Sequence, residues 1–346
     1  MNTNVSADRL ENSQNASRND TFLENLCADD EAPVGPEQVT IVIHVLTLLV
    51  ALLGNTFLIT AFLSAKDSMM LLIVNMAASD LLMAIFLIPR VITREIIRSS
   101  AFLVHGSGGV FLCKMCTFLS DMSLAVSTQS LVVIFVERLL AIVYPMLYKK
   151  ITLNVRWRAI ISTWITSAAI HAPYFYIMRL IPFHSNDSKI QLCIPTWEPA
   201  FEDESAHLRY NIFLFTTVLL IPLFTISVLS AIVVCGSRKD KLAESRTEKG
   251  KRRNRERIKK LHRMAAVTVT ALFICWTPYV VFAFLDLFSL RPVPECSKIQ
   301  KVMRYISRIL ASSYCAVNPC ICLIFLRNFS RELGKICKKN FCKWSI

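Results

Sequence analysis

The stretch SLVVIFVERLLAIVYP, residues 130–145, places an acid beside a base near the end of a long apolar run. The run begins near residue 111, so it is long enough to cross roughly 30 Å of hydrocarbon as an α-helix. An ionisable side chain in such a segment costs at least a few kcal/mol, so Glu137 and Arg138 are expected to have a function. We expect both to reach the membrane interface at the end of the helix, where the carboxylate can hold the guanidinium.

The composition extends the membrane assignment to the whole chain. The 346 residues are 54% hydrophobic and only 18% charged, which is too apolar for a soluble domain of this size. Windows of about 19 residues locate seven apolar stretches. They lie roughly at 40–63, 69–92, 111–143, 159–178, 210–235, 264–290 and 302–326. The alternation typical of a membrane β-barrel is not seen. We therefore predict an all-α membrane protein, with a seven-transmembrane helix bundle over residues 39–326.

Basic residues predict the orientation of this bundle. Lys and Arg are dense at 238–263 and after residue 327, and they recur at Lys149, Lys150, Arg156 and Arg158, so these segments are expected in the cytoplasm. Seven crossings then place the N-terminus outside, and residues 1–38 are expected to form an extracellular glycosylated tail without a cleavable signal peptide. The potential N-glycosylation sites are Asn4, Asn15, Asn19 and Asn186. The sequence thus predicts a multi-pass plasma-membrane protein.

The formal net charge of +14 does not indicate nucleic-acid binding. The excess lies in the predicted cytoplasmic loops, where anionic membrane lipids attract it. The basic tail at 327–346 begins with an amphipathic pattern, because Phe325 and Phe329 are four residues apart and Arg327 and Arg331 lie on another face. We predict a short amphipathic eighth helix on the inner leaflet. Two cysteines in this tail are candidates for palmitoylation: Cys337 and Cys342.

Four of the twelve cysteines are expected at the extracellular face, where disulfides persist: Cys27, Cys113, Cys193 and Cys296. Four cysteines allow three pairings. We favour Cys113 with Cys193, which would tie the third stretch to the long outer loop, and Cys27 with Cys296 as a second bridge. Cys116, one helical turn from Cys113, is a competitor for the first pairing.

Polar residues within the apolar stretches suggest a buried site. The carboxylate of Asp80 can be neutralised by a proton or by a cation, and Ser127 and Asn318 offer oxygen ligands at comparable depth. A structural hydrogen-bond network without an ion is an equally favoured interpretation. Prolines also interrupt several stretches. Pro278 follows Trp276 in CWTP, and Pro319 follows Asn318, so both prolines are expected to kink their helices.

The ordered set of motifs resembles the rhodopsin-like (class A) G-protein-coupled receptors, in particular neuropeptide receptors. The set comprises Gly54-Asn55, AASDL with Asp80, Cys113, Glu137-Arg138 in ERLLAIVYP, Trp164, Pro222, CWTP and Asn318-Pro319. The resemblance covers residues 40–336. The sequence departs from the family at Leu139, Ser230 and Cys322, where tyrosines are usual.

This resemblance implies a switch built from residues of the set. Glu137 would hold Arg138 at rest, and an outward swing of the sixth helix would release Arg138 to support the C-terminal helix of a Gα subunit, with Met146 inserting into that partner. The residues implied in the switch are Glu137, Arg138, Met146, Trp276, Pro278, Asn318 and Pro319. Asp80, Ser127 and Asn318 match the sodium pocket of the family. A heterotrimeric G protein, and also arrestin, are the implied cytoplasmic partners.

The ligand class is predicted from charge. Other members of the family bind amines or retinal through an acid at the position of Ser120 or a lysine at that of Ser312, so neither ligand is expected. The residues that we predict to bind the ligand are Asp121, Arg308, Arg304, Arg90, Trp276 and Asp286. Mixed charge favours an extracellular peptide. We also expect that Asp121 and Arg308 can pair when the site is empty.

Two other functions remain as alternatives. A receptor of the same fold for an acidic lipid or another small anionic ligand fits the basic residues. A transporter, from a different class, would show internal repeats and broken helices, which are not seen. We expect no enzyme activity, because the six histidines are scattered and form no metal-ligand motif. No cofactor is expected apart from Na⁺ as an allosteric ion.

Overall fold

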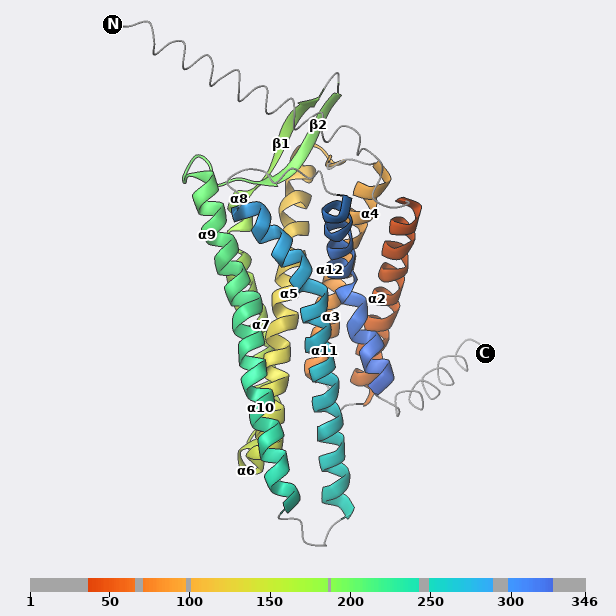
Figure 1. Cartoon of the computed structure of the whole chain (residues 1–346), viewed down its shortest axis with the longest axis vertical. Helices are drawn as coiled ribbons and strands as arrows, with labels where there is room; N and C mark the ends of the chain where they lie inside the picture. Colours follow the sequence, from red (N-terminus) through yellow and green to blue (C-terminus); the bar gives the residue numbers. More distant parts are fainter. Residues whose placement is uncertain are drawn as a thin grey trace, which may run out of the picture.

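The computed structural model describes residues 37–65, 71–97, 101–185, 188–242, 249–288 and 298–325. Long helices run side by side along the long axis of the molecule, with a β-hairpin at one end (Figure 1). The helices are α2 (Glu37–Ala65), α3 (Leu71–Phe86), α4 (Ile88–Ile97), α5 (Gly106–Val143), α6 (Pro145–Tyr148), α7 (Leu153–His171), α8 (Tyr174–Ile177), α9 (Asp203–Phe215), the π-helix η3 (Thr216–Leu220), α10 (Ile221–Leu242), α11 (Lys249–Phe288) and α12 (Lys298–Phe325). Each of the seven predicted apolar stretches contains a helix.

Five helical segments of the described residues are long and apolar enough to cross a membrane by themselves. They are 38–61, 71–97, 106–143, 205–233 and 266–285. The helices α7 and α12 are not among these segments; α7 carries Arg156, and α12 carries Arg304 and Arg308. Both nevertheless pack inside the bundle, α7 against α5 and α12 against α2 and α11.

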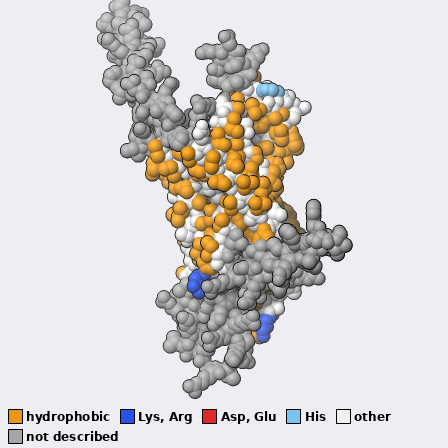
Figure 2. Space-filling model, turned by 90° about the vertical axis from the view of Figure 1, so that its right-hand side faces the viewer, with side chains coloured by type: hydrophobic (Ala, Val, Ile, Leu, Met, Phe, Trp, Pro, Cys, Tyr) orange, Lys and Arg blue, Asp and Glu red, His pale blue; other side chains and the backbone are white. Residues whose placement is uncertain are grey.

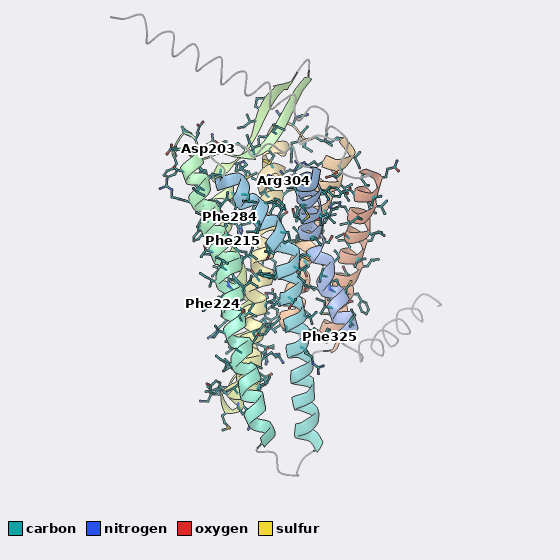
Figure 3. The ribbon with its side chains drawn as sticks, viewed as in Figure 1. Asp203, Phe215, Phe224, Phe284, Arg304 and Phe325 are labelled. Carbon is teal, nitrogen blue, oxygen red and sulfur yellow. A yellow bond between two sulfur atoms is a disulfide. The ribbon has the colours of Figure 1, made fainter. Side chains whose placement is uncertain are left out.

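Hydrophobic side chains cover the outer face of the bundle at mid-height. Figure 2 shows them on one side of the described part of the molecule. Leu53, Phe224 and Ile324 are 71%, 73% and 75% exposed, respectively. Phe224 points away from the bundle in Figure 3. Exposed apolar surface on this scale is unusual for a soluble monomer, whereas it suits contact with lipid chains.

The helix α5 is the centre of the bundle, because it packs against α3, α7, α10 and α11. Its Leu131 and Phe135 are fully buried in the largest apolar cluster, with Leu72 of α3 and Leu272 of α11. Hydrocarbon gives helices little hydrophobic reason to associate, so packing and interhelical hydrogen bonds must hold them together.

A polar cluster supplies such hydrogen bonds between three helices. Asn75 of α3 donates to Ser130 Oγ of α5 at 2.7 Å, and its side-chain oxygen accepts from Trp164 Nε1 of α7 at 2.8 Å. On the other side of the bundle, Asn55 of α2 donates to the carbonyl oxygen of Cys315 in α12 at 3.0 Å. These side chains fix the helices in register inside the bundle.

The extracellular hairpin was not predicted from the sequence. The fourth stretch was expected to remain helical to residue 178, but α7 ends at His171, just before Pro173, and β1 (Met178–Ser185) begins at Met178. This strand pairs antiparallel with β2 (Ser188–Pro195), with Leu180 opposite Cys193. An apolar run of this length does not distinguish a helix end from a strand, because both bury the same side chains.

Prolines shape the helices as expected, with one additional feature. Pro278 and Pro319 lie inside α11 and α12, and α11 changes direction toward its outer end (Figure 1). Upstream of Pro222, the backbone widens into η3, a π-helix. Because proline lacks an N–H, the preceding turn loses a hydrogen bond and can adopt another helical spacing.

Several predictions fall outside the described residues and stay predictions. They concern the glycosylation sites Asn4, Asn15, Asn19 and Asn186, the bridge between Cys27 and Cys296, and the eighth helix with Cys337 and Cys342. The boundaries of the N-terminal tail at residue 38 and of the cytoplasmic tail at residue 327 are likewise untested.

Gly54 of α2 lies against Pro319 of α12. A Cβ added there would lie 2.6 Å from the Cβ of Pro319, whose ring cannot move aside. We therefore expect Gly54→Ala to cost about 1–3 kcal/mol of stability through overpacking and to lower the melting temperature of the purified protein by several degrees. Gly108→Ala is the control, because a Cβ there meets nothing within 4 Å. Equal melting temperatures for both variants would contradict this packing.

Candidate functional site

A pocket of about 740 Å³ opens at the extracellular end of the bundle. Its walls come from α2, α4, α5, α9, α11 and α12, and residues of η3 and α8 complete it. Trp276 lines the pocket, with Tyr279 one turn further out and its ring centroid 5.9 Å away. This volume is in the range of sites that bind small molecules or the end of a larger ligand.

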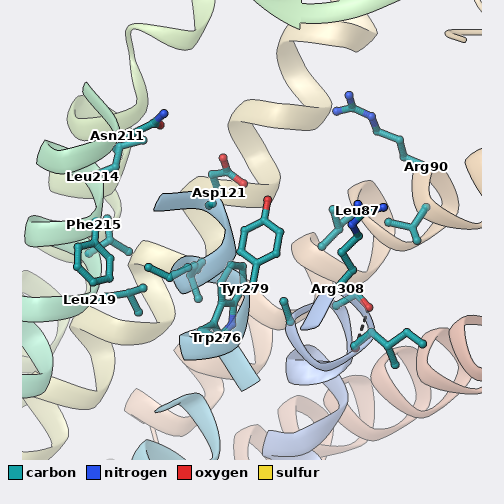
Figure 4. Close-up of a pocket in the computed structure, with 18 of the residues that line it drawn as sticks. Leu87, Arg90, Asp121, Asn211, Leu214, Phe215, Leu219, Trp276, Tyr279 and Arg308 are labelled. Atoms are coloured by element: carbon teal, nitrogen blue, oxygen red, sulfur yellow. Dashed lines mark hydrogen bonds between the residues drawn. The ribbon is translucent and has the colours of Figure 1, made fainter. Parts of the chain in front are cut away.

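Charges of both signs line this pocket, and on α4 Glu95 is next to Arg94. Figure 4 shows the Asp121 carboxylate facing the interior from α5, while Arg90 and Arg308 approach from another side. Arg90 donates from Nη1 to Thr117 Oγ1 at 3.0 Å. Arg94 of α4 also lines the pocket. The pocket can therefore meet an anionic group and a cationic group of one ligand at separate places.

The predicted pairing of Asp121 with Arg308 is wrong. Asp121 Oδ2 instead accepts a hydrogen bond of 2.7 Å from the hydroxyl of Tyr174. Tyr174 lies in α8, directly after α7, and a tyrosine hydroxyl satisfies a half-buried carboxylate without a second charge. Among the described residues, Arg308 forms no ion pair and its side chain is exposed to the pocket. Sequence alone did not indicate Tyr174, because the helix was expected to continue past it.

One of the predicted ligand-binding residues is placed differently, and another is not tested. Arg304 is 9% exposed and does not line the pocket; its guanidinium lies over the ring of Phe282 in α11, 5.5 Å from the centroid. Figure 3 labels it near the outer end of α12. The side chain of Asp286 is outside the described set. The pocket thus brings together Asp121, Arg90, Arg308 and Trp276 of the predicted set, and leaves Arg304 in a helix contact.

A disulfide fixes the hairpin over the pocket. Cys113 of α5 and Cys193 of β2 are bonded, with their Cα atoms 5.7 Å apart, which confirms this predicted bridge. The competitor Cys116 is a free thiol. Beside the bridge, Tyr174, Ile177 and Met178 form a buried apolar cluster with Cys113. The hairpin is therefore held by a covalent bond and by packing at the same point.

Phe215 and Phe284 line the side of the pocket between α9 and α11. Their ring centroids are 4.9 Å apart with an edge-on geometry, and they lie side by side in Figure 3. Aromatic pairs of this kind contribute about 0.5–1.5 kcal/mol beyond their buried area. Movement of the outer end of α11 would therefore change its contact with α9 directly.

Below the pocket, Asp80 lies fully inside the bundle. It is 2% exposed, and Asn318 Nδ2 donates to its Oδ2 at 2.6 Å. The other two members of the predicted set are buried as well, with Ser127 1% and Asn318 3% exposed. Ser127 Oγ and Asn318 Oδ1 lack a partner of good geometry among the described residues. A carboxylate with two unsatisfied oxygen donors nearby fits a small hard cation.

At the cytoplasmic end, Glu137 contacts two arginines. Its Oε2 accepts from Arg138 Nη2 at 3.0 Å, as expected, and its Oε1 accepts from Arg156 Nε of α7 at 2.7 Å. Glu137 is 4% and Arg138 2% exposed, so the prediction that both reach the interface is wrong. They are buried because α7 and the short helix α6 pack around this end of α5. The contact with Arg156 was missed, because its sequence position indicated only a basic cytoplasmic loop.

Met146 lies in α6, next to this ionic cluster. Its side chain is 71% exposed at the cytoplasmic end. Tyr148 of the same short helix accepts a hydrogen bond of 3.4 Å from Arg156 Nη2. The exposed Met146 therefore lies on the same short helix as Tyr148, which is hydrogen-bonded to Arg156 of the cluster around Glu137.

Comparison with known proteins matches this arrangement to one family. A family model described as "7 transmembrane receptor (rhodopsin family)" matches residues 54–321. The chain belongs to this family. The membership and the observed helices together confirm the predicted seven-helix membrane bundle and make the protein a multi-pass receptor of the plasma membrane.

Several curated receptors are similar over most of their length. The chain is 27% identical to a QRFP-like peptide receptor of Branchiostoma floridae, over 90% of this chain and 78% of that receptor. It is 27% identical to neuropeptide Y receptor type 4 of Mus musculus, over 85% and 78%. It is 28% identical to prokineticin receptor 2 of Mus musculus, over 83% and 74%. The family and these relatives are receptors rather than enzymes, and they do not favour the transporter alternative.

The disulfide gives a first test of the receptor's outer surface. Cys113→Ser or Cys193→Ser frees the hairpin from α5, and we expect either variant to lose its response to activating peptide extracts. Cys116→Ser is the matched control, because this thiol is one helical turn away and unbonded. Surface amounts are compared through an epitope tag on the N-terminus. A full response from both bridge variants would show that the pocket does not depend on the bridge.

Proposed function

We propose that this receptor binds an extracellular peptide in the outer pocket and activates a heterotrimeric G protein at its cytoplasmic face. The observation that carries the proposal is the pocket, whose lining includes Trp276 of α11 together with charges of both signs. The relatives described as a peptide receptor and a neuropeptide receptor support the choice of a peptide.

The pocket volume limits how a peptide can bind. A space of about 740 Å³ suits a drug-sized group, so one end of a peptide would enter it. The remainder would lie against the hairpin, which the Cys113–Cys193 bridge holds at the rim. A peptide carboxylate would bind Arg308 and Arg90 through charge-assisted hydrogen bonds, and a basic group would bind Asp121.

Ligand binding would change the bundle through α11. Trp276 contacts the pocket, and Pro278 lies two residues further out in the same helix. A ligand that contacts Trp276 more favourably in one of two positions of α11 shifts the population toward that position. The inner half of α11 packs against α5, which carries Arg138. Displacement of α11 would expose Arg138, next to the already exposed Met146, to the C-terminal helix of Gα, and the same face would serve arrestin.

The alternative ligand is an acidic lipid or another small anion. It is favoured by one observation, the three arginines Arg90, Arg94 and Arg308 in the pocket lining. A small anion would need these residues but neither Asp121 nor the hairpin. Fractions of an extract that retain activity after protease digestion would support this alternative over a peptide.

Na⁺ is proposed as an allosteric ion of the same receptor. Asp80, Ser127 and Asn318 would hold it, and the ion would supply the positive charge that keeps a buried carboxylate ionised. Because Asn318 also precedes Pro319 in α12, an ion held here would favour one position of this helix. The hydrogen bond from Asn318 to Asp80 remains available without an ion.

Removal of Arg308 tests the proposed ligand site. The receptor is expressed with a panel of Gα subunits, and second-messenger responses to fractionated peptide extracts are measured. A hydrogen bond to a charged group contributes about 1.5–3 kcal/mol, so Arg308→Gln should raise the half-maximal concentration about 10- to 100-fold. Arg209→Gln is the control, because Arg209 is exposed at the outer end of α9 and hydrogen-bonds to Ser205 outside the pocket. Equal shifts in both variants would exclude this site.

Exchange of Na⁺ for K⁺ at constant ionic strength tests the ion site. We expect basal nucleotide exchange on the G protein to rise when Na⁺ is replaced, because the ion favours the resting arrangement. Asp80→Asn keeps the shape but removes the charge, so it should abolish the difference between the two salts. An unchanged response to Na⁺ in Asp80→Asn would place the ion elsewhere.

A further inference from the structure

Glu137 is shared unequally by its two arginines. Both Nε and Nη2 of Arg156 lie 2.7 Å from Glu137 Oε1, whereas Arg138 reaches Oε2 with Nη2 alone at 3.0 Å. Arg138 Nε and Nη1 are buried and have no hydrogen-bond partner among the described residues. The closer and more complete contact of Glu137 is therefore with α7, not with its neighbour in the chain.

A buried carboxylate with only one cationic partner is left unpaired when that partner leaves. Taking the partner away leaves an uncompensated buried charge, which is strongly unfavourable, and the carboxylate responds by taking up a proton. Glu137 is 4% exposed, so this argument applies to it directly. A second guanidinium that stays in place removes the need for the proton.

We propose that Arg156 is a positioning residue that keeps Glu137 ionised when Arg138 leaves, so that G-protein binding requires no proton uptake at Glu137. This inference rests on the proposed coupling to a G protein. Arg138, on α5, moves to new acceptors, and the unpaired carbonyl groups at the C-terminus of a partner helix suit its two unsatisfied nitrogens. Arg156, on α7, remains with Glu137.

Tyr148 holds Arg156 from the other side and does not titrate in the physiological range. It accepts from Arg156 Nη2 at 3.4 Å. Burial, followed by the charge of Glu137, raises the pKa of the Tyr148 hydroxyl above its usual value, so it stays neutral. Because Tyr148 and Met146 share α6, a partner that docks on Met146 contacts the segment that stabilises Arg156.

Other charged groups near this end of the bundle are considered in the design of the test. Among the described side chains on the elements packed against α5, Arg158 of α7 and Arg263 of α11 are exposed cations, and Asp80 of α3 lies far above in the core. The basic cytoplasmic ends of α10 and α11, with His262, have side chains outside the described set. A histidine there could titrate near neutral pH, so its contribution must be subtracted.

The test measures the affinity of the nucleotide-free G protein for the purified full-length receptor in lipid nanodiscs as a function of pH. No ligand is needed, because the G protein itself selects the open state. If binding takes up one proton, affinity rises about tenfold for each unit that the pH falls. We expect no such slope for the wild type and a slope approaching this value for Arg156→Gln, because its Glu137 has only Arg138.

Three further variants make the result specific. Arg156→Lys keeps the charge and should restore the pH-independent affinity. The double variant Glu137→Gln/Arg156→Gln has no carboxylate to protonate at this site, so its affinity should not depend on pH through Glu137. Any slope that remains in this variant measures the titration of other groups, such as His262. Arg158→Gln, two residues along the same helix and exposed, should behave as the wild type.

The possible outcomes separate a failure of this inference from a failure of the proposed function. A tenfold slope in the wild type that Glu137→Gln abolishes would show that Glu137 takes up a proton despite Arg156, and would overturn the inference without requiring any Arg156 variant to fold. An Arg156→Gln variant whose affinity for the G protein does not change with pH would also overturn it. If no G protein binds the wild type at any pH, the proposed function fails and the inference falls with it.

Discussion

The requirement that a carboxylate in a membrane has a partner organises this receptor. Asp121, Asp80 and Glu137 lie at three depths, and each contacts a side chain from another helix: Tyr174, Asn318 and Arg156. Apolar packing between helices has little directional preference in lipid, so these polar contacts specify which faces meet. Glu137 imposes the strongest constraint of the three, because it is buried together with two full charges. The bundle must close around this cluster at rest, and any other arrangement must provide Glu137 with a partner again.

This constraint explains why the two ends of the molecule can communicate. The outer pocket and the inner cluster both include residues of α5, and α11 contributes Trp276 to the pocket and packs against α5. A close-packed bundle does not deform continuously, so a small displacement at the pocket is transmitted as a choice between discrete arrangements. The proline inside α11, Pro278, has no backbone N–H to donate. The helix can therefore change direction there without breaking a hydrogen bond.

The sequence predicted those features that depend on residues close together in the chain. Hydropathy located all seven helices, and the adjacent Glu137 and Arg138 do contact one another. The contact with Arg156 could not be derived in this way, because Arg156 is 19 positions further along the chain than Glu137 and lies on a different helix. Positive charge near a predicted membrane boundary indicates the cytoplasm equally well for an exposed and for a buried arginine. The pairing of Asp121 with Arg308 was wrong for a related reason: opposite charges suggested a bond, whereas the fold supplied a neutral donor, Tyr174, at 2.7 Å.

The proposed movement of α11 would begin where packing is least complete. A cavity of about 20 Å³ lies between the Asp80 site and the inner cluster, and five helices line it, including α11 through Met264 and Thr268 and α12 through Asn318 and Cys322. Side chains around a void have already lost part of their dispersion contacts. Separation of α11 from α12 at this level therefore costs less than separation at the apolar cluster around Phe135. Cys322, where the family resemblance leads one to expect a tyrosine, lines this cavity. The sequence departure and the cavity thus assign the same part of the bundle as the place where the inner half of α11 begins to move.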